Sequence, residues 1–248
     1  MTTLVVVPTY DEAESLPRLL DGLAVHAPDV DVLVVDDASP DGTGQIADRL
    51  ARLDPRVHVL HRSRKEGLGV AYRAGFAWAL ARDYDVVVEM DADGSHRPQD
   101  LPVILARVAQ GDADLVLGSR WIPGGSVVNW PWYRRLISRG GTWYAQKALA
   151  IPVQDATGGF RAFRRATLES LPLERIASQG YCFQVDLVRR VLSAGMSVVE
   201  VPITFVERTQ GRSKMSGSIV REAFWRVTVW GVRRRVRWLK ARRRGTDA

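Results

Sequence analysis

Residues 86–96 read Val-Val-Val-Glu-Met-Asp-Ala-Asp-Gly-Ser-His, a short apolar run followed at once by two carboxylates. Runs of this length that are rich in valine are typical of strands buried on both faces of a parallel sheet. Further runs of this kind, separated by helical patterns, occupy Leu4–Val7, Val32–Val35, Val57–Leu60 and Leu115–Leu117. The alternation of strands and helices predicts an α/β fold with a mainly parallel sheet flanked by helices.

The segments between these runs have the periodicity of helices that cover a sheet. The first has leucines at the i, i+3, i+4, i+7 spacing of one buried helix face, namely Leu16, Leu19, Leu20 and Leu23. After about residue 120 the pattern changes to a loop rich in Gly, Trp and Pro, then to helices, and then to a strand near Val198–Phe205. From the length of 248 residues we expect one large domain over residues 1–217 and a helical tail over residues 218–248.

The composition restricts the class of protein and the kinds of site that it can hold. The formal net charge of +7 favours anionic partners without choosing between nucleic acid, phospholipid and a phosphorylated substrate. Cys182 is the only cysteine and there are four His, so a disulfide is excluded and a Cys/His zinc site is poorly supported. The first residues lack the pattern of a secretion signal, and no uncharged apolar run reaches the roughly 18 residues of a membrane span. The sequence therefore predicts a cytoplasmic protein with oxygen ligands for any metal.

Asp91 and Asp93 follow the apolar run directly, and residues two apart in an extended chain point to the same side. Two carboxylates that lie so close to each other repel. A hard divalent cation such as Mg²⁺ or Mn²⁺ removes this repulsion and can also bind a diphosphate. The alternative is a pair of Asp that merely ends a strand and caps a turn, which is the commoner meaning of an isolated pair. Context favours the cation, because ligands of open α/β sheets bind beyond the carboxyl ends of the strands.

A second acidic cluster follows the run that ends at Val35. Asp36 and Asp37 lead through a Pro-Asp-Gly turn into a helix that is expected to open near Thr43. Asp41 and Thr43 suit the turn and the helix cap, whereas Asp37 can accept hydrogen bonds from a ribose or from the N–H of a base. Neither a GxxxxGK[ST] loop nor a complete GxGxxG fingerprint is present, which disfavours P-loop enzymes and dehydrogenases.

Six short motifs follow one another along the chain: Val7–Glu12, Val35–Thr43, Met90–His96, Gly118–Arg120, Thr157–Arg161 and Gly211–Lys214. Together they resemble the family 2 glycosyltransferases of the GT-A fold, and most closely the polyprenol (dolichol) phosphate mannosyltransferases. The resemblance spans roughly residues 4–217 and implies a Rossmann-like GT-A catalytic domain over residues 1–217. It also implies an inverting transfer of mannose from GDP-mannose to polyprenyl phosphate, which yields polyprenyl-phosphate β-mannose and GDP.

The resemblance implies residue roles at the positions that match. The nucleotide pocket would comprise Pro8, Tyr10, Glu12, Asp37 and Ala92. The metal on the donor diphosphate would be held by Asp91 and Asp93. Relatives often place Gln where this chain has Ser95, whose shorter side chain favours a bridging water over direct ligation of the metal. The donor diphosphate would be gripped by Arg208 and Lys214, and the acceptor phosphate by Arg120, Arg134 and Ser138. The residues with catalytic roles would be Asp91, Asp93, Arg120, Arg208 and Lys214.

The expected chemistry needs charge stabilisation and no covalent intermediate. Cleavage of the bond from the anomeric carbon to phosphate leaves a diphosphate, whose growing charge a cation, Arg and Lys can stabilise. A phosphate monoester is mostly ionised at pH 7, so we expect direct in-line attack with inversion. The alternative is a carboxylate base, for which Asp155 is the candidate. Gln184 and Asp186 are candidates either to orient the sugar or to serve as structural polar groups.

From Ile219 onward the chain is helix-prone and mixes aromatic residues with many arginines. This composition is typical of a basic amphipathic helix that lies on a bilayer, with its cations near anionic headgroups. A nucleic-acid arm can have the same composition, but the frequent tryptophans favour the membrane. We therefore expect a peripheral protein on the cytoplasmic face of a membrane, without a nucleic-acid partner. The sequence leaves open whether a separate membrane protein anchors it.

Two other functions stay open from the sequence. The donor can be UDP-glucose, because motifs of this kind report base and sugar poorly, and the chain would then be a polyprenyl-phosphate glucosyltransferase. The other is a non-catalytic basic adaptor that binds membrane or nucleic acid through its tail. The carboxylates at the strand ends argue against the adaptor.

Overall fold

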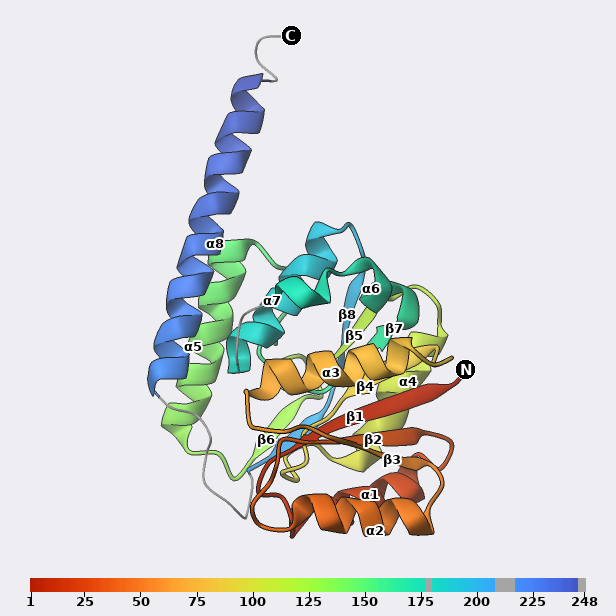
Figure 1. The fold of residues 1–248 in the computed structure, drawn as a ribbon. Helices are drawn as coiled ribbons and strands as arrows, with labels where there is room; N and C mark the ends of the chain where they lie inside the picture. The colour runs from red at the N-terminus through yellow and green to blue at the C-terminus, as the bar shows by residue number, and fades with distance from the viewer. Residues whose placement is uncertain (177–179, 208–216, 245–248) are drawn as a thin grey trace.

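A seven-stranded sheet forms the centre of the computed structural model, which describes residues 1–176, 180–207 and 217–244 (Figure 1). Its strands are β1 (Thr3–Thr9), β2 (Asp31–Asp36), β3 (Val57–His61), β4 (Val86–Glu89), β5 (Leu115–Ser119), β7 (Arg161–Arg164) and β8 (Val198–Pro202). Their order is β3-β2-β1-β4-β7-β5-β8. Strand β7 is antiparallel to both of its neighbours, and the other pairs are parallel. The mainly parallel α/β fold expected from the sequence is confirmed.

The five valine-rich runs all lie in or at the ends of strands of this sheet. The strand expected near residues 198–205 is two strands, β8 and β9 (Thr204–Val206). Strand β9 pairs with β6 (Ser126–Val128) in a separate two-stranded sheet. Strand β7 was not predicted, because its sequence Arg-Ala-Phe-Arg lacks the apolar run that marks the others.

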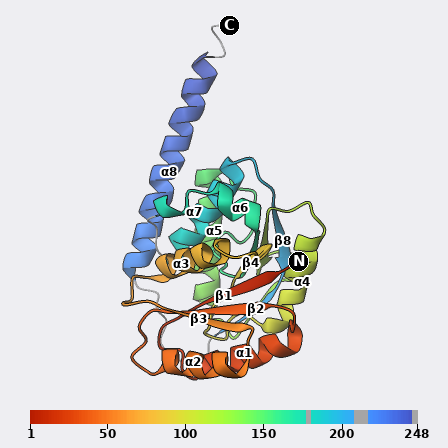
Figure 2. The same ribbon diagram turned by 45° about the vertical axis from the view of Figure 1, so that its right-hand side comes forward.

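Helices cover both faces of the large sheet (Figures 1 and 2). They are α1 (Ser15–His26), α2 (Thr43–Leu53), α3 (Leu68–Leu80), α4 (Leu101–Ala109), α5 (Trp132–Leu149), α6 (Arg165–Ser170), α7 (Gly180–Ser193) and α8 (Gly217–Arg244), with short 3₁₀ turns at Pro98–Asp100 and Leu173–Arg175. One core contains the expected leucines of α1 with α4, and the other contains residues of α3, α6 and α7. A Cβ at Gly75 in α3 would lie 2.3 Å from Cγ1 of Val6, so glycine is what lets α3 pack this closely on β1.

The first half of α8 packs against α5. The rings of Phe224 and Tyr144 stack with centroids 4.5 Å apart, and the hydroxyls of Tyr144 and Thr228 are hydrogen-bonded at 2.6 Å. Val227 is buried, and a Cβ at Gly231 would lie 2.9 Å from a carbonyl oxygen of α5. Helix α8 therefore runs beside α5 and then continues past its end (Figure 1).

These contacts bear on the expected division between residues 217 and 218, which stays a prediction. The division coincides with the start of α8, so a deletion from residue 219 removes core contacts as well as the basic end of the chain. A deletion confined to residues 237–248 leaves the contacts of Phe224, Val227 and Gly231 in place. No helix in the described part of the chain has both the length and the apolar character needed to cross a membrane.

Candidate active site

Asp91 lies two residues beyond the end of β4 and is held from two sides. The hydroxyl of Tyr72 in α3 donates a hydrogen bond to Asp91 Oδ1 at 3.1 Å. The backbone N–H of Asp91 donates to Nδ1 of His96 at 3.1 Å, which folds the following loop back onto the strand end. Burial lowers the pKa of His96, so the ring is neutral and can accept this bond at pH 7. The position of the Asp91 carboxylate is thus set by the protein itself.

Asp93 is held by the turn that follows it. The backbone N–H of Ser95 donates to Asp93 Oδ1 at 3.0 Å. Gly94 between them has a φ of 76°, a conformation that favours glycine. The structure thus shows the Ser95 backbone orienting Asp93, while ligation of a metal by Ser95 stays a prediction.

Gly159, in the segment before β7, approaches these residues closely. A Cβ at Gly159 would lie 3.4 Å from Asp91 Oδ2 and 3.4 Å from Cε1 of His96. Any larger side chain would press on the carboxylate or occupy the space beside it. The glycine of the Thr157–Arg161 motif therefore keeps that space clear.

Asp91 and Asp93 fit a hard divalent cation that takes its other ligands from a diphosphate. Both offer carboxylate oxygens, which Mg²⁺ and Mn²⁺ prefer. Within the described ranges, no three His, Cys, Asp or Glu side chains are grouped as in a complete protein cage for a metal. Mg²⁺ is usually held by one or two carboxylates and takes its other ligands from water and substrate phosphates, so two Asp suffice.

Two cations lie beside residues predicted to bind the nucleoside. Arg62 forms a close ion pair with Asp37, and Nη2 of Arg62 lies 2.7 Å from Oε2 of Glu66. Burial raises the pKa of the Asp37 carboxyl, and the positive charge of Arg62 opposes that shift. Nζ of Lys65 lies 3.6 Å from the ring centroid of Tyr10. Neither Arg62 nor Lys65 was predicted from the sequence, although both follow the end of β3 as the predicted residues follow β1 and β2.

Glu12 is positioned where α1 and α2 begin. Its backbone N–H donates to Oγ1 of Thr43 at 2.9 Å, and the hydroxyl of Ser15 donates to Glu12 Oε2 at 2.7 Å. Asp41 Oδ1 accepts hydrogen bonds from the N–H and the hydroxyl of Thr43 at 3.0 and 2.6 Å. The turn expected at Asp41 and Thr43 is thereby confirmed, whereas the N-cap of α2 is Gly42 and has no side-chain cap hydrogen bond.

Four further residues were predicted to bind the nucleotide-sugar donor. Pro8 is in β1, paired in register with Val35 of β2. The side chain of Ala92 is buried in the core, so only its backbone can face a ligand. Arg208 and Lys214 lie outside the described residues, and their roles stay predictions.

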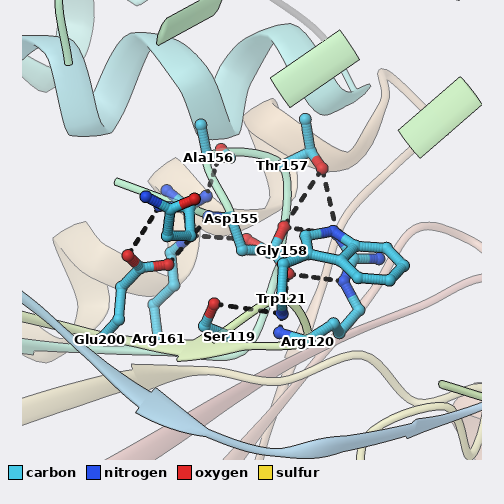
Figure 3. A network of polar contacts seen from close by, with 10 residues as sticks. Ser119, Arg120, Trp121, Asp155, Ala156, Thr157, Gly158, Arg161 and Glu200 are labelled. Carbon is cyan, nitrogen blue, oxygen red and sulfur yellow. Dashed lines mark hydrogen bonds and ion pairs between the residues drawn. The ribbon is translucent and has the colours of Figure 1, made fainter. Parts of the chain in front are cut away.

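Arg120 follows β5 and forms a buried ion pair with Asp155 (Figure 3). Nε and Nη2 of Arg120 donate to the two carboxylate oxygens of Asp155 at 2.7 and 2.6 Å, and Nη2 also donates to Oγ1 of Thr157 at 3.0 Å. The carboxylate of Glu200 in β8 accepts hydrogen bonds from the backbone N–H groups of Gln154 and Asp155 at 2.7 and 2.8 Å. The network thus joins the end of β5, the loop before β7 and strand β8.

This pairing bears on the hypothesis that Asp155 is a general base. A base needs a lone pair directed at the proton that it removes, whereas both oxygens of Asp155 accept hydrogen bonds from Arg120. A bidentate pair of this kind fixes the plane of the guanidinium group. The geometry therefore favours Asp155 as the residue that orients Arg120.

Trp130 brings the two arginines predicted for the acceptor together. Cζ of Arg134 lies 4.5 Å from a ring centroid of Trp130, and Cζ of Arg120 lies 5.4 Å from it. Arg134 also forms a close ion pair with Glu207. Ser138 follows Arg134 by four residues in α5, so both lie on one face of that helix. The structure thus places two guanidinium groups against one buried aromatic ring beside the start of α5.

Comparison with known proteins shows the family of the chain. The model of the family described as Glycosyl transferase family 2 matches residues 4–171. The chain belongs to glycosyltransferase family 2. This glycosyltransferase is 56% identical over 235 residues to the polyprenol monophosphomannose synthase of Mycolicibacterium smegmatis, covering 94% of the chain and 88% of that relative. It is 55% identical over 242 residues to the undecaprenyl-phosphate mannosyltransferase of Micrococcus luteus, covering 98% and 99% of the two chains.

Solved structures share the fold of this family 2 glycosyltransferase at lower identity. One is the glucosyl-3-phosphoglycerate synthase of Mycobacterium tuberculosis in complex with UDP, with a TM-score of 0.68, 20% identity, and coverage of 93% of this chain and 80% of that one. Another is a mannosyltransferase of Pyrobaculum calidifontis in complex with GDP-Man and Mn²⁺, with a TM-score of 0.61, 21% identity, and coverage of 95% and 64%. These similarities support the GT-A fold expected from the sequence.

A buried charged cluster of this glycosyltransferase was not predicted from the sequence. Arg161 of β7 is fully buried and donates hydrogen bonds to the carbonyl oxygens of Ala156, Gly158 and Gln184 at 2.8, 2.7 and 2.7 Å. Its Nε lies 4.0 Å from Oε2 of Glu89 at the end of β4. Arg161 therefore ties the glycine loop to α7 beneath the site, and Gln184 takes part through its backbone. The first three residues of β7 are all buried, and a charged residue at such a position gives no signal of burial in the sequence.

Replacing Glu89 by Gln should flatten the pH dependence of the free energy of unfolding. Burial raises the pKa of Glu89 to about 8 against the opposing charge of Arg161, whereas the ordinary value is 4.5. A raised carboxyl pKa stabilises the folded state fully below about pH 4.5, and this contribution is lost as the pH rises to about 8, by a few kcal/mol. Thermal unfolding in EDTA at pH 5, 6.5 and 8 measures the loss. Exposed Glu14→Gln is the control, and equal slopes in the wild type and Glu89→Gln would contradict a buried neutral carboxyl.

Proposed function

We propose that the chain transfers mannose from GDP-mannose to polyprenyl phosphate and releases GDP and polyprenyl-phosphate β-mannose. The observation that carries the proposal is identity of 55–56%, over nearly the full length of both chains, to two proteins named for mannosylated polyprenyl or undecaprenyl phosphate. The geometry agrees with it, because the carboxylates, the ion pair of Asp37 with Arg62, and Arg120 lie at the carboxyl ends of parallel strands. Arg134 of α5 contacts the same tryptophan ring as Arg120. The solved mannosyltransferase with GDP-Man and Mn²⁺ has the same fold, which supports the choice of donor only as a class.

In this proposal Asp91 and Asp93 hold Mg²⁺ or Mn²⁺ on the donor diphosphate. The bound cation supplies electrostatic stabilisation of the charge that develops on the leaving GDP. Tyr10, Glu12 and Asp37 contact the guanosine, with Asp37 oriented by Arg62. Arg208 and Lys214 complete the grip on the diphosphate from the segment outside the described residues. The protein's share of the work is to orient the donor and to exclude water from its phosphates.

In the same proposal, the phosphate of the acceptor lipid is bound by Arg120, Arg134 and Ser138. A phosphate monoester carries its nucleophilic charge already at pH 7, so it needs positioning more than it needs a base. Asp155 keeps the guanidinium of Arg120 in one plane, so that its positive charge has a fixed position for the phosphate. The attack on the anomeric carbon is then in line with the leaving diphosphate and inverts its configuration.

Exposed apolar side chains near these arginines support a lipid acceptor. Trp132, Leu136 and Trp143 of α5 are 72%, 61% and 60% exposed. Large exposed apolar groups on a soluble protein mark surfaces that bind partners or membranes, and arginines at 135 and 139 lie among them. We infer that this side of the domain lies against the cytoplasmic face of a membrane, where α8 adds its basic end.

One incubation tests the proposed reaction. Purified protein receives labelled GDP-mannose or UDP-glucose, a short polyprenyl phosphate, and Mn²⁺, Mg²⁺ or excess EDTA. The expected result is label in the lipid phase with GDP-mannose and a metal, and none with EDTA. Transfer from UDP-glucose and not from GDP-mannose would show that the chain is a polyprenyl-phosphate glucosyltransferase. Absence of transfer from both donors to the lipid would contradict the proposed function.

Deleting residues 237–248 should weaken binding to anionic vesicles by tenfold or more at low salt. The segment contains five Lys or Arg, and each is worth about 1 kcal/mol near an anionic surface. Turnover of a short soluble polyprenyl phosphate should change little, because the α5–α8 contacts are kept. Vesicle sedimentation and the transfer assay measure the two effects. Equal losses in both would count against a membrane role of this end of the chain.

A further inference from the structure

A hollow of about 910 Å³ lies between the C-terminal end of α5, helix α7 and the middle of α8. None of the described residues that line it belongs to the motifs at the strand ends, so it is separate from the candidate active site. Its lining residues come from the end of α5, from α7 and from α8, which passes the end of α5 in Figure 1. The residues proposed for the transfer reaction do not line this hollow.

The hollow is lined by four arginines, Arg189 and Arg190 of α7 and Arg233 and Arg234 of α8. Behind it lies one buried carboxylate, Asp186, whose oxygens are 2.5 Å from Nη2 of Arg189 and 3.2 Å from Nε of Arg190. These ion pairs favour the structural role for Asp186 over the orientation of a sugar. Among the described residues, four positive charges beside one negative charge leave an excess that suits a phosphate group, which Arg binds through paired N–H donors.

The remaining lining is mostly apolar. Leu149 and Ile151 are buried at the end of α5, and Trp230 of α8 lies with its ring 4.9 Å from Cζ of Arg189. Val232 and Val236 of α8 are largely exposed and line the same hollow. A soluble phosphate compound would make no contact with the apolar lining, and a neutral hydrocarbon would make no ion pair with the arginines. A ligand with a phosphate next to a hydrocarbon chain matches both.

We propose that this hollow binds the anionic phosphodiester headgroup of a membrane phospholipid, with the start of its acyl chains against Trp230 and the valines of α8. Charge complementarity with the four arginines selects an anionic lipid over a zwitterionic one. A lipid bound here contacts α7 and α8 together, so it ties the packed domain to the membrane at a second point besides the basic end of α8. This site goes beyond the proposed transfer reaction and does not depend on which sugar is transferred.

The test uses short-chain lipids below their micelle concentration, with the full-length chain in a calorimeter. The probes are dihexanoyl phosphatidylglycerol, dihexanoyl phosphatidylcholine and inorganic phosphate. Arg234→Glu should weaken phosphatidylglycerol binding by about tenfold or more, because it removes one attraction and adds a repulsion. Arg235→Glu is the matched control, since Arg235 is exposed on the same helix but is not among the lining residues. Its binding should stay within about twofold of the wild type.

The outcomes separate the hollow from general electrostatics. Equal losses in Arg234→Glu and Arg235→Glu would overturn the proposal, as would phosphatidylcholine or inorganic phosphate binding as tightly as phosphatidylglycerol. Both variants should unfold at the wild-type temperature and turn over a short soluble acceptor at the wild-type rate. A wild type that binds phosphatidylglycerol in this way but transfers no sugar would remove the proposed function and leave the lipid site intact.

Discussion

Asp91→Asn should lower the rate of sugar transfer by about 10²- to 10³-fold, the scale seen when one group that stabilises developing charge is removed. The substitution keeps the size of the side chain and its hydrogen bond with Tyr72, but it takes one negative charge from the pair that we propose holds the cation. The concentration of Mn²⁺ that gives half-maximal activity should rise together with the loss of rate. Steady-state transfer at a series of Mn²⁺ concentrations measures both quantities.

Asp21→Asn is the matched control for Asp91→Asn, because Asp21 is exposed in α1, which covers one face of the sheet. It should leave the rate and the metal dependence unchanged. Wild-type activity of Asp91→Asn with an unchanged metal requirement would rule out Asp91 as a ligand of the cation.

Arg120→Met and Asp155→Leu should each destabilise the protein by about 3–5 kcal/mol, because each leaves an unpaired charge in a buried site. The double variant should recover much of this free energy of unfolding, since replacing both members of a buried ion pair by apolar groups is often neutral or stabilising. Transfer activity should nevertheless stay lost in the double variant, because the guanidinium group that we propose receives the acceptor phosphate is absent. Urea unfolding and the transfer assay together separate the two roles of Arg120.

Arg107→Met provides the comparison for this cycle. Its partner Asp112 is largely exposed, so the loss should stay within about 1 kcal/mol. A double variant Arg120→Met/Asp155→Leu that is stable and transfers sugar as the wild type does would show that the pair is purely structural. The acceptor site would then have to be placed elsewhere.

The fold could be predicted where one local signal dominates. Valine-rich runs such as Val86–Val88 are typical of strands buried in a sheet, and the leucine stripe of α1 marks one buried helix face. Strand β7 carries no such signal, because it begins with a buried arginine, whose hydrogen bonds go to two carbonyl oxygens of the preceding loop and to that of Gln184 in α7. The packing of Phe224 on Tyr144 was likewise hidden, since the composition of α8 resembles that of a surface helix.

The residues of the candidate site could be singled out from the sequence, but their pairings could not. The rule that ligands bind beyond strand ends located Asp37, Asp91 and Asp93 without any knowledge of their neighbours. It did not reveal that Arg62 pairs with Asp37, or that Asp155, 35 residues from Arg120 in the sequence, holds its guanidinium group. Such pairings depend on which loops the topology brings together, and the spacing of residues along the chain does not encode them.

The account depends most on a divalent cation held by Asp91 and Asp93 against the donor diphosphate. The most direct measurement is the anomalous difference density of Mn²⁺ in crystals grown with GDP. We predict one strong peak in contact with the carboxylates of Asp91 and Asp93 and with the diphosphate, which Asp91→Asn weakens or abolishes. Bound GDP with both carboxylates turned away and no peak between them would contradict the account.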